Sequence, residues 1–147
     1  MRTETATVAP KRAFTRAELG VVVVIVGVLT AFAVPRFLDS AERARAAEAF
    51  NYLATVRAAE ARHHALHGRY TDDVAKLDAR LQAPAYFKVG AIELASAAAG
   101  SDESWELALT RSDASAGYGT YSVVFNQDGF DRADSTIPDL VNPFQTP

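Results

Sequence analysis

The most constraining feature of the sequence is an uncharged run of sixteen residues, 19–34, close to the N-terminus. A membrane-spanning helix needs about 20 apolar residues and the core of a secretion signal about 7 to 15, so the run lies between the two classes. Extending it by a few residues at both ends gives the length of a span but includes Arg16, Glu18 and Arg36. We therefore expect one helix in a membrane, with long arginine side chains reaching the headgroups.

Charges on either side of this run predict its orientation. Lys11, Arg12 and Arg16 lie on the N-terminal side, and basic residues favour the cytoplasmic face of a membrane. The sequence beyond Pro35 is rich in charged residues. We therefore expect one pass through the inner (cytoplasmic) membrane, with the C-terminal domain in the periplasm or outside the cell.

Composition narrows the class of protein. The chain has 147 residues, about one domain, and its net charge of -3 gives no reason to expect a nucleic-acid partner. There is no cysteine, which excludes disulfides, thiolate metal sites and a cysteine nucleophile. The sequence has no phosphate-binding loop, dinucleotide-binding glycine pattern or nucleophile elbow, so we expect no enzyme activity.

Glu18 does not suit a simple membrane anchor. A carboxylate close to the hydrocarbon layer is costly unless it lies among the headgroups or gains a partner. Composition alone leaves both interpretations open.

The residues around Glu18 resemble the N-terminal signal of a known family. The run KRAFTRAEL at residues 11–19, the apolar segment and the run AVPRF at residues 33–37 resemble the class III signal of type IV pilins and type II secretion pseudopilins. In that family a prepilin peptidase cleaves before a phenylalanine and methylates the new amine. The resemblance implies cleavage between Ala13 and Phe14 and methylation of Phe14.

The resemblance also implies roles in filament assembly. After cleavage Glu18 would be the fifth residue of the chain and would pair with the terminal amine of a neighbouring subunit. Gly27 and Pro35 stand where the family has a helix-loosening glycine and a proline. A head-to-tail contact of this kind repeats without closing and builds a helical filament. The implied function is a structural subunit of a type IV pilus or a type II secretion pseudopilus, closest in outline to the major pseudopilins.

The implied fold is α+β, a pilin-like lollipop in which a long N-terminal α-helix, membrane-embedded in its first half, packs on a small antiparallel β-sheet. The implied segments are a leader peptide (1–13), a transmembrane and assembly helix (14–35), an amphipathic second half of the helix (36–67) and an extracytoplasmic sheet domain (68–147). The implied partners are copies of the chain, the prepilin peptidase, minor pilins or pseudopilins, the inner-membrane assembly platform and the lipid bilayer. The filament would lie on the cell surface or in the periplasm.

The second half of the helix is amphipathic in the sequence. Gly68 predicts the end of this helix, as a glycine after the last turn commonly does. His63 and His67 are one turn apart and could share a divalent ion, but the helix dipole also favours cations here, so we expect a solvated helix end. The expected apolar stripe consists of Phe37, Ala41, Ala44, Phe50, Leu53, Val56 and Ala59.

Beyond residue 71 the pattern becomes that of short strands. Residues 72–81 allow a short helical turn. The runs 86–94, 105–110 and 118–125 are β-branched or aromatic and predict three antiparallel strands, each with one apolar face. The small and polar residues 95–104 predict an exposed loop.

The C-terminal tail contains acidic residues around Gly129. Asp128, Asp131, Asp134 and Asp139 could bind calcium, because oxygen ligands in a glycine-containing loop suit that ion. The major pseudopilins that the chain resembles hold a calcium ion in this region. Acidic residues of a surface loop are more often solvated, so calcium is a candidate cofactor and no cofactor is certain.

Two other interpretations of the N-terminal run remain open. Residues 31–33 read Ala-Phe-Ala, so ordinary signal peptidase could cut after Ala33 and release a secreted soluble binding domain. Alternatively, the run stays uncut as a simple anchor for an extracytoplasmic domain. Glu18 has no assembly role in either case.

Overall fold

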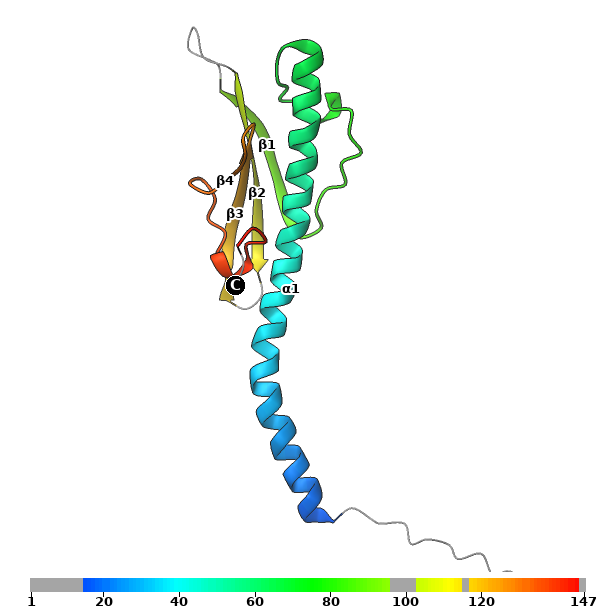
Figure 1. Cartoon of the computed structure of the whole chain (residues 1–147), viewed down its shortest axis with the longest axis vertical. Coiled ribbons are helices and arrows are strands. Elements are labelled where there is room, and N and C mark those ends of the chain that lie inside the picture. Colours follow the sequence, from blue (N-terminus) through cyan, green and yellow to red (C-terminus); the bar gives the residue numbers. More distant parts are fainter. Residues whose placement is uncertain (1–14, 96–102, 115–116, 146–147) are drawn as a thin grey trace, which may run out of the picture. The chain divides into compact units, whose positions relative to one another are not determined.

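The fold is α+β, as expected, with one long helix and a four-stranded antiparallel sheet (Figure 1). The computed structural model describes residues 15–95, 103–114 and 117–145. The chain divides into two compact units, Met1–Pro35 and Arg36–Pro147. The elements in chain order, with η for a 3₁₀ helix, are α1 (Arg16–His67), η1 (Val74–Lys76), β1 (Phe87–Ala95), β2 (Ser104–Ala114), β3 (Gly119–Asn126), β4 (Gly129–Asp131) and η3 (Asp139–Val141).

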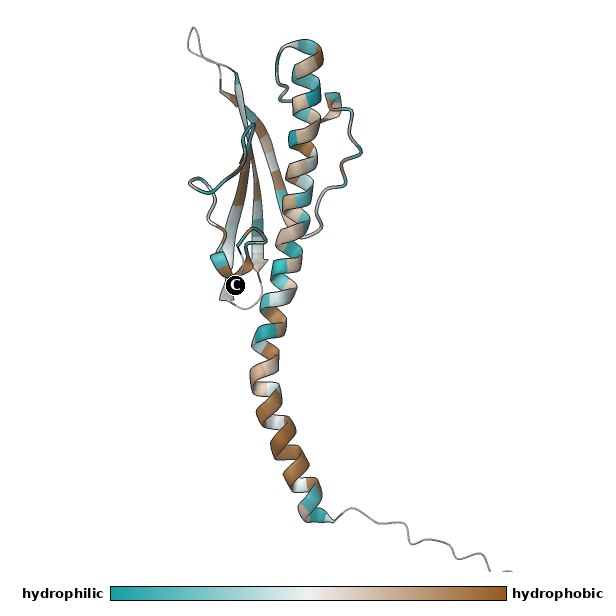
Figure 2. Cartoon of the chain, viewed as in Figure 1, coloured by the Kyte–Doolittle hydropathy of each residue, from teal (hydrophilic) through white to brown (hydrophobic). Residues whose placement is uncertain are grey.

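The described part of the first unit is the N-terminal portion of α1 with Thr15 before it. Valine, isoleucine, leucine, alanine and phenylalanine occupy every position from 21 to 34 except Gly27 and Thr30. Figure 2 shows most residues of this portion of the ribbon in the colour of hydrophobic residues. A helix that is apolar on all sides has no polar face for water, which is typical of a membrane span or the centre of a helix bundle.

In the second unit, α1 buries one face against the sheet. The expected stripe was wrong at its N-terminal end, because Phe37 is 71% exposed and Ala44 is exposed as well. The buried face instead begins at Glu42 and includes Glu60, two acidic residues outside the expected apolar stripe. It follows steps of three and four residues through Glu42, Ala46, Ala49, Leu53, Val56 and Glu60, with Phe50, Tyr52 and Ala59 beside them.

The sheet is a meander with the strand order β1-β2-β3-β4. The three expected strands are confirmed, with boundaries that differ by a few residues, and the expected helical turn is the short helix η1. The fourth strand was not expected. It pairs with β3 through a tight turn in which Asn126 Oδ1 accepts the N–H groups of Asp128 and Gly129, and Gly129 has a φ of 125°.

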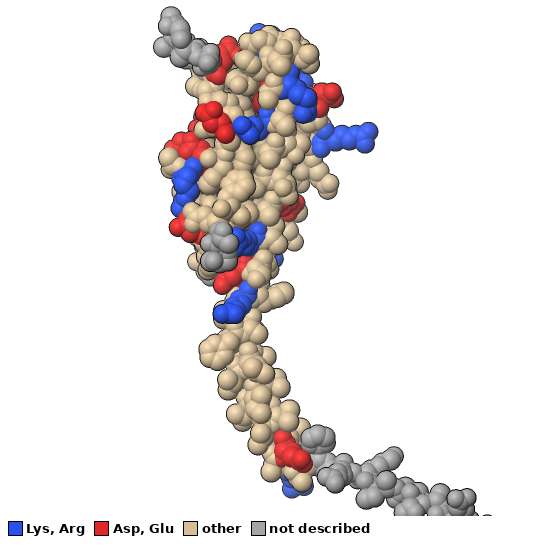
Figure 3. Space-filling view, viewed as in Figure 1, with Lys and Arg blue, Asp and Glu red and all other residues tan. Residues whose placement is uncertain are grey.

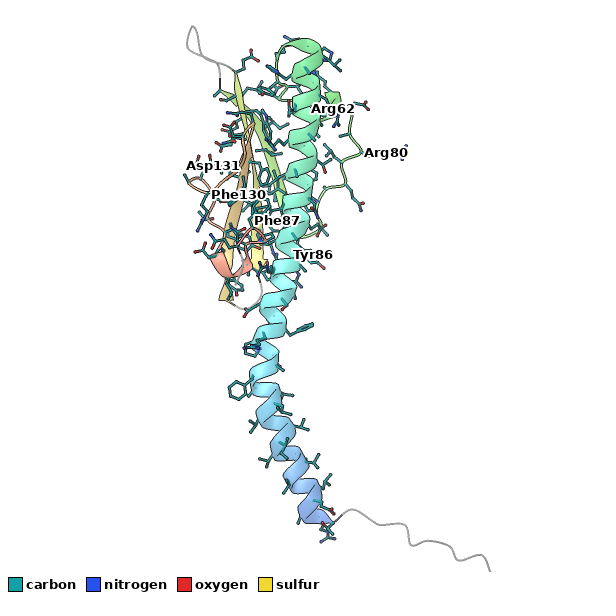
Figure 4. The ribbon with its side chains drawn as sticks, in the orientation of Figure 1. Arg62, Arg80, Tyr86, Phe87, Phe130 and Asp131 are labelled. Atoms are coloured by element: carbon teal, nitrogen blue, oxygen red, sulfur yellow. The ribbon has the colours of Figure 1, made fainter. Side chains whose placement is uncertain are left out.

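Alternating residues of β2 and β3 form the sheet side of the core. The expected alternation is confirmed, since these residues are at most 3% exposed: Trp105, Leu107, Leu109, Tyr121, Val123 and Phe125. On the helix side, the ring of Phe50 meets those of Phe125, Phe130 and Phe144 at centroid distances of 5.6, 5.1 and 4.8 Å. Figure 4 labels Phe130, the middle residue of β4, and Phe87, the first residue of β1.

Residues 135 and 136 of the C-terminal tail bond to the backbone of β3. Ser122 N–H donates to Thr136 Oγ1 at 2.8 Å, and Thr136 N–H donates to the carbonyl of Ser122 at 3.0 Å. Val124 N–H donates to Ser135 Oγ at 2.9 Å. These bonds hold residues 135 and 136 along the edge of β3, where Val124 is only 3% exposed.

A charged group lies inside the second unit. Glu42 is fully buried, and its Oε1 accepts hydrogen bonds from Arg111 Nε at 2.7 Å and from the Tyr121 hydroxyl at 3.0 Å. Its Oε2 accepts from Arg111 Nη2 at 3.2 Å and from Arg45 Nη1 at 3.0 Å. The ring of Tyr86 lies 4.7 Å from the Arg45 guanidinium and 5.6 Å from that of Arg111 (Figure 4).

The hydrogen bonds decide the protonation of this group. Burial raises the pKa of Glu42, but the bonds from Arg111, Arg45 and Tyr121 outweigh it and lower the pKa to about 2. Burial and the negative charge of Glu42 both raise the pKa of Tyr121. Glu42 is therefore an ionised carboxylate and Tyr121 a neutral hydroxyl near neutral pH.

Candidate assembly site

The apolar side chains of the first unit are exposed. Phe32 is 72% exposed, and an 18-residue window of α1 with a mean hydropathy of 2.5 has no buried residue. By length and composition this helix can cross a membrane. On the face shown in Figure 3, the same stretch of α1 carries no charged residue. The exposed large apolar residues here are Leu19, Val21, Val22, Val23, Val24, Ile25, Val26, Val28, Leu29, Phe32 and Val34.

This exposure is unfavourable in water. Burying one large aliphatic or aromatic side chain contributes about 1.5–3 kcal/mol. These eleven side chains are 46–72% exposed, so burying them fully would contribute roughly 10–20 kcal/mol more. The segment needs lipid or other helices around it.

Thr15 and Glu18 form a reciprocal cap at the start of α1. Glu18 Oε2 accepts the Thr15 N–H at 3.0 Å and the Thr15 hydroxyl at 2.9 Å, and Glu18 N–H donates to Thr15 Oγ1 at 3.2 Å. This capping box fixes where the helix begins, because it satisfies N–H groups that lack partners within the helix. Both side chains are exposed, and Glu18 Oε1 accepts no hydrogen bond from the described residues.

Gly27 and Pro35 both lie inside α1. A Cβ on Gly27 would meet nothing within 4 Å, so packing within the chain does not require a glycine at this position. The Thr30 hydroxyl donates to the carbonyls of Val26 and Gly27 at 2.9 and 3.0 Å. A proline inside a helix removes one backbone hydrogen bond, yet α1 is helical on both sides of Pro35. The assembly roles of Gly27 and Pro35 stay predictions.

The expected cleavage site, Ala13 and Phe14, lies outside the described residues. The first residues described next to it are Thr15 and the first turn of α1. The expected exposed loop at residues 95–104 also lies mostly outside the described part of the chain.

Asp131 is the most connected of the candidate calcium ligands. One of its oxygens accepts the N–H groups of Ala133 and Asp134 at 2.9 and 3.3 Å, and the other accepts from Asn126 Nδ2 at 3.0 Å. These bonds form the turn after β4. Asp131 therefore has a structural role without a metal ion.

The other tail carboxylates have separate contacts. Asp139 forms an exposed ion pair with Arg132 at 2.7 Å, and Asp128 accepts from Gln127 Nε2 at 3.4 Å. Within the described ranges, no group of three or more His, Cys, Asp or Glu residues is arranged to hold a metal ion. Calcium binding by the tail stays a prediction.

Sequence reasoning missed the inward-facing glutamates of α1. Glu42 lies one turn before Ala46 and two turns before Ala49, and both alanines are buried. The helical repeat could therefore have placed Glu42 on the buried side of α1. Its partner Arg111 is 69 residues away, and nothing near Arg111 in the sequence marks it as buried. A second missed contact joins the Tyr118 hydroxyl to Asp39 at 2.7 Å.

Comparison with known proteins bears on the family that the chain resembles. No protein-family model and no solved structure matches the chain. Among curated proteins, the chain is similar to PilA5 of Thermus thermophilus, described as a type IV narrow pilus major component, with 46% identity over 50 residues. The chain resembles a type IV pilin. The match includes 34% of this chain and 43% of the relative, so it spans less than half of the relative's length.

The pilin-like character rests on two findings that agree. The match to a type IV pilus component confirms the resemblance expected from the N-terminal residues. The fold adds the long helix, apolar at its start, and the four-stranded antiparallel sheet. In this pilin-like chain, the exposed apolar part of α1 and the capped Glu18 form the candidate assembly site.

Proposed function

We propose that the chain is a structural subunit of a type IV pilus-like filament. The observation that carries this proposal is the exposed apolar part of α1 in a chain similar to a type IV pilus major component. Such a surface is compatible with lipid before assembly and with neighbouring helices afterwards. The role is structural and not enzymatic, and the partners that follow from it are copies of the chain, minor subunits and the machinery that assembles them.

Maturation is part of the proposal. A prepilin peptidase removes residues 1–13 and methylates the new amine of Phe14. Residues 14–35 anchor the subunit in the inner membrane and later bundle in the filament, while the remaining residues stay on the far side of the membrane. The relative is named as a pilus component, which favours a pilus over a secretion pseudopilus.

The two carboxylate oxygens of Glu18 have different partners in this proposal, Thr15 of the same chain and the adjacent subunit. Oε2 holds Thr15, and Oε1 accepts no hydrogen bond from the described residues. In a filament, Oε1 accepts from the amine of Phe14 of the adjacent subunit. Losing one partner of a buried ion pair costs about 3–5 kcal/mol, and that loss would repeat at every subunit contact.

The first experiment is an intact mass and an N-terminal peptide of the protein isolated from its own membranes. A chain that begins at N-methylated Phe14 supports the proposal. A chain that begins at Val34 would contradict it and indicate a secreted soluble domain. An uncut chain beginning at Met1 would indicate a simple anchor.

The second experiment separates the charge of Glu18 from its capping role. Glu18→Ala and Glu18→Gln remove the charge, whereas Thr15→Ala disrupts the cap and keeps the carboxylate. We expect both Glu18 variants to be processed but to yield few or no sheared filaments, and Thr15→Ala to yield filaments. Normal filament yield from Glu18→Ala would refute the charge-pairing account.

A further inference from the structure

The uncharged run of α1 is too short to cross a bilayer alone. Its sixteen residues extend about 24 Å along a helix, whereas the hydrocarbon core of a bilayer is about 30 Å thick and takes about 20 residues. Extension at the N-terminal end adds Arg16 and Glu18, whereas extension through residues 35–38 adds one charge, Arg36. The long side chain of Arg36 can reach the headgroups, so the second extension costs less. A bilayer that holds α1 therefore has its hydrocarbon boundary near residue 38.

The exposure of Phe37 agrees with this boundary. Phe37 is the second residue of the second unit, and it is 71% exposed although it belongs to the expected apolar stripe. Burying a phenylalanine side chain contributes about 1.5–3 kcal/mol. The sheet leaves this ring largely uncovered, and lipid at this depth would bury it.

Hydrogen bonds hold the sheet domain to α1 directly after the boundary. The Tyr118 hydroxyl, just before β3, donates to Asp39 at 2.7 Å. Arg43 donates to the carbonyl of Gln145 in the tail. Asp39 and Arg43 lie one and five residues beyond residue 38, or roughly 1.5 and 7.5 Å along the helix. Since the headgroup layer is about 5–7 Å deep on each side, both attachments are at the depth of the headgroups.

This end of the second unit carries exposed apolar side chains. Leu140 of η3 is 52% exposed, and Phe144, one residue before Gln145, is 66% exposed. In Figure 1, the red η3 lies at the end of the sheet where β2 ends and β3 begins. Tyr118 is half-buried at the same end, and tyrosine is enriched at bilayer surfaces because its ring is apolar and its hydroxyl polar. Apolar side chains at this depth fit a lipid surface better than water.

We propose that the end of the second unit formed by Phe37, Tyr118, Leu140 and Phe144 docks on the bilayer that holds α1. Phe37 lies in the edge of the hydrocarbon core and the other three lie among the headgroups. This inference rests on the membrane anchoring proposed above. It gives the sheet domain its own contact with lipid, so a subunit that enters a filament must break this contact as well as withdraw its helix from the membrane.

Single spin labels measure the depth of each position. The chain has no cysteine, so Phe37→Cys and Leu140→Cys each give one site for a nitroxide in the full chain. Val28→Cys in the apolar run and Leu66→Cys in the last turns of α1 are the references, at positions 54% and 79% exposed. The protein is reconstituted in vesicles of phosphatidylethanolamine and phosphatidylglycerol. EPR then compares collisions of each label with oxygen, which is lipid-soluble, and with a water-soluble nickel chelate.

We expect the ratio of oxygen to nickel collisions to follow depth. It should be high at Val28 and Phe37, intermediate at Leu140 and lowest at Leu66, with Leu140 several-fold above Leu66. Lipids with longer acyl chains thicken the hydrocarbon core and should raise the ratio at Leu140. Leu66 is about 42 Å beyond residue 38 along the helix, so its ratio should not respond.

Two results would overturn the docking. One is a ratio at Leu140 equal to that at Leu66, and the other is a ratio at Phe37 equal to that at Leu66, which would end the hydrocarbon core before Phe37. In both cases a label at Val28 that is shielded from nickel leaves the membrane anchor intact, whereas water access at Val28 would contradict the anchor itself. Fluorescence of Trp105, which is 2% exposed, verifies that each variant is folded.

Discussion

Replacing Arg111 by methionine tests the buried charged group of the second unit. The substitution keeps much of the side-chain volume but removes the guanidinium that donates two hydrogen bonds to Glu42. Arg45 and Tyr121 still donate to the same carboxylate. Removing one partner of a buried ion pair costs about 3–5 kcal/mol. Because two donors remain, we expect the free energy of unfolding at neutral pH to fall by about 3 kcal/mol.

The pKa of Glu42 gives the pH-dependent part of the stabilisation by Arg111, Arg45 and Tyr121 together. It falls from 4.5 to about 2 in the folded chain, and each pKa unit corresponds to about 1.4 kcal/mol, or about 3 kcal/mol in total. Since the folded-state pKa is the lower one, this stabilisation is present above about pH 4.5 and is lost as the pH falls towards about 2. As the pH falls through this range, the free energy of unfolding of Arg111→Met should therefore decrease less than that of the unchanged chain.

Urea unfolding of the full chain in detergent measures both effects. The single tryptophan, Trp105, is buried in the core, so its emission reports unfolding of the second unit. Arg132→Met is the matched control, because the ion pair of Arg132 with Asp139 is exposed and should contribute less than about 1 kcal/mol. The reasoning is refuted if Arg111→Met costs no more than Arg132→Met.

Three smaller perturbations test other contacts of the second unit. Tyr118→Phe removes the hydrogen bond to Asp39 and should lower the free energy of unfolding by about 1 kcal/mol in thermal melts, and an unchanged midpoint would argue against that bond. Gly90→Ala places a Cβ 2.8 Å from the carbonyl oxygen of Ala108, so we expect a loss of about 1–3 kcal/mol in urea unfolding unless β1 shifts freely. Gly68→Ala forces alanine to a φ of 72° after the helix and should cost about 1–2 kcal/mol; a neutral effect in the same assay would contradict this.

Local sequence signals predicted much of the fold. The uncharged run predicted the apolar start of α1, Gly68 predicted its end, and alternation in residues 105–110 predicted the buried side chains of β2. These signals work because each depends on the composition or local backbone conformation of a single element. The exposure of the apolar run also follows from its composition, since it has no polar face.

Long-range pairing was not readable from the sequence. Glu42 and Glu60 were not part of the expected apolar stripe, because a buried glutamate is tolerated only with partners, and Arg111, the partner of Glu42, lies on β2. The three-residue strand β4 is too short to show alternation. The candidate site was predicted through Glu18, but its reciprocal bond with Thr15 became visible only in the structure.

The meander order of the sheet has a consequence for folding kinetics. Every strand pairs with its neighbour in the sequence, so the sheet needs only short loops to close, and no disulfide has to form. The contact between α1 and β2, by contrast, joins Glu42 to Arg111 across 69 residues. Local contacts form fastest, so hairpins should precede the docking of α1. In stopped-flow measurements, Arg111→Met should then speed unfolding and leave the folding rate nearly unchanged.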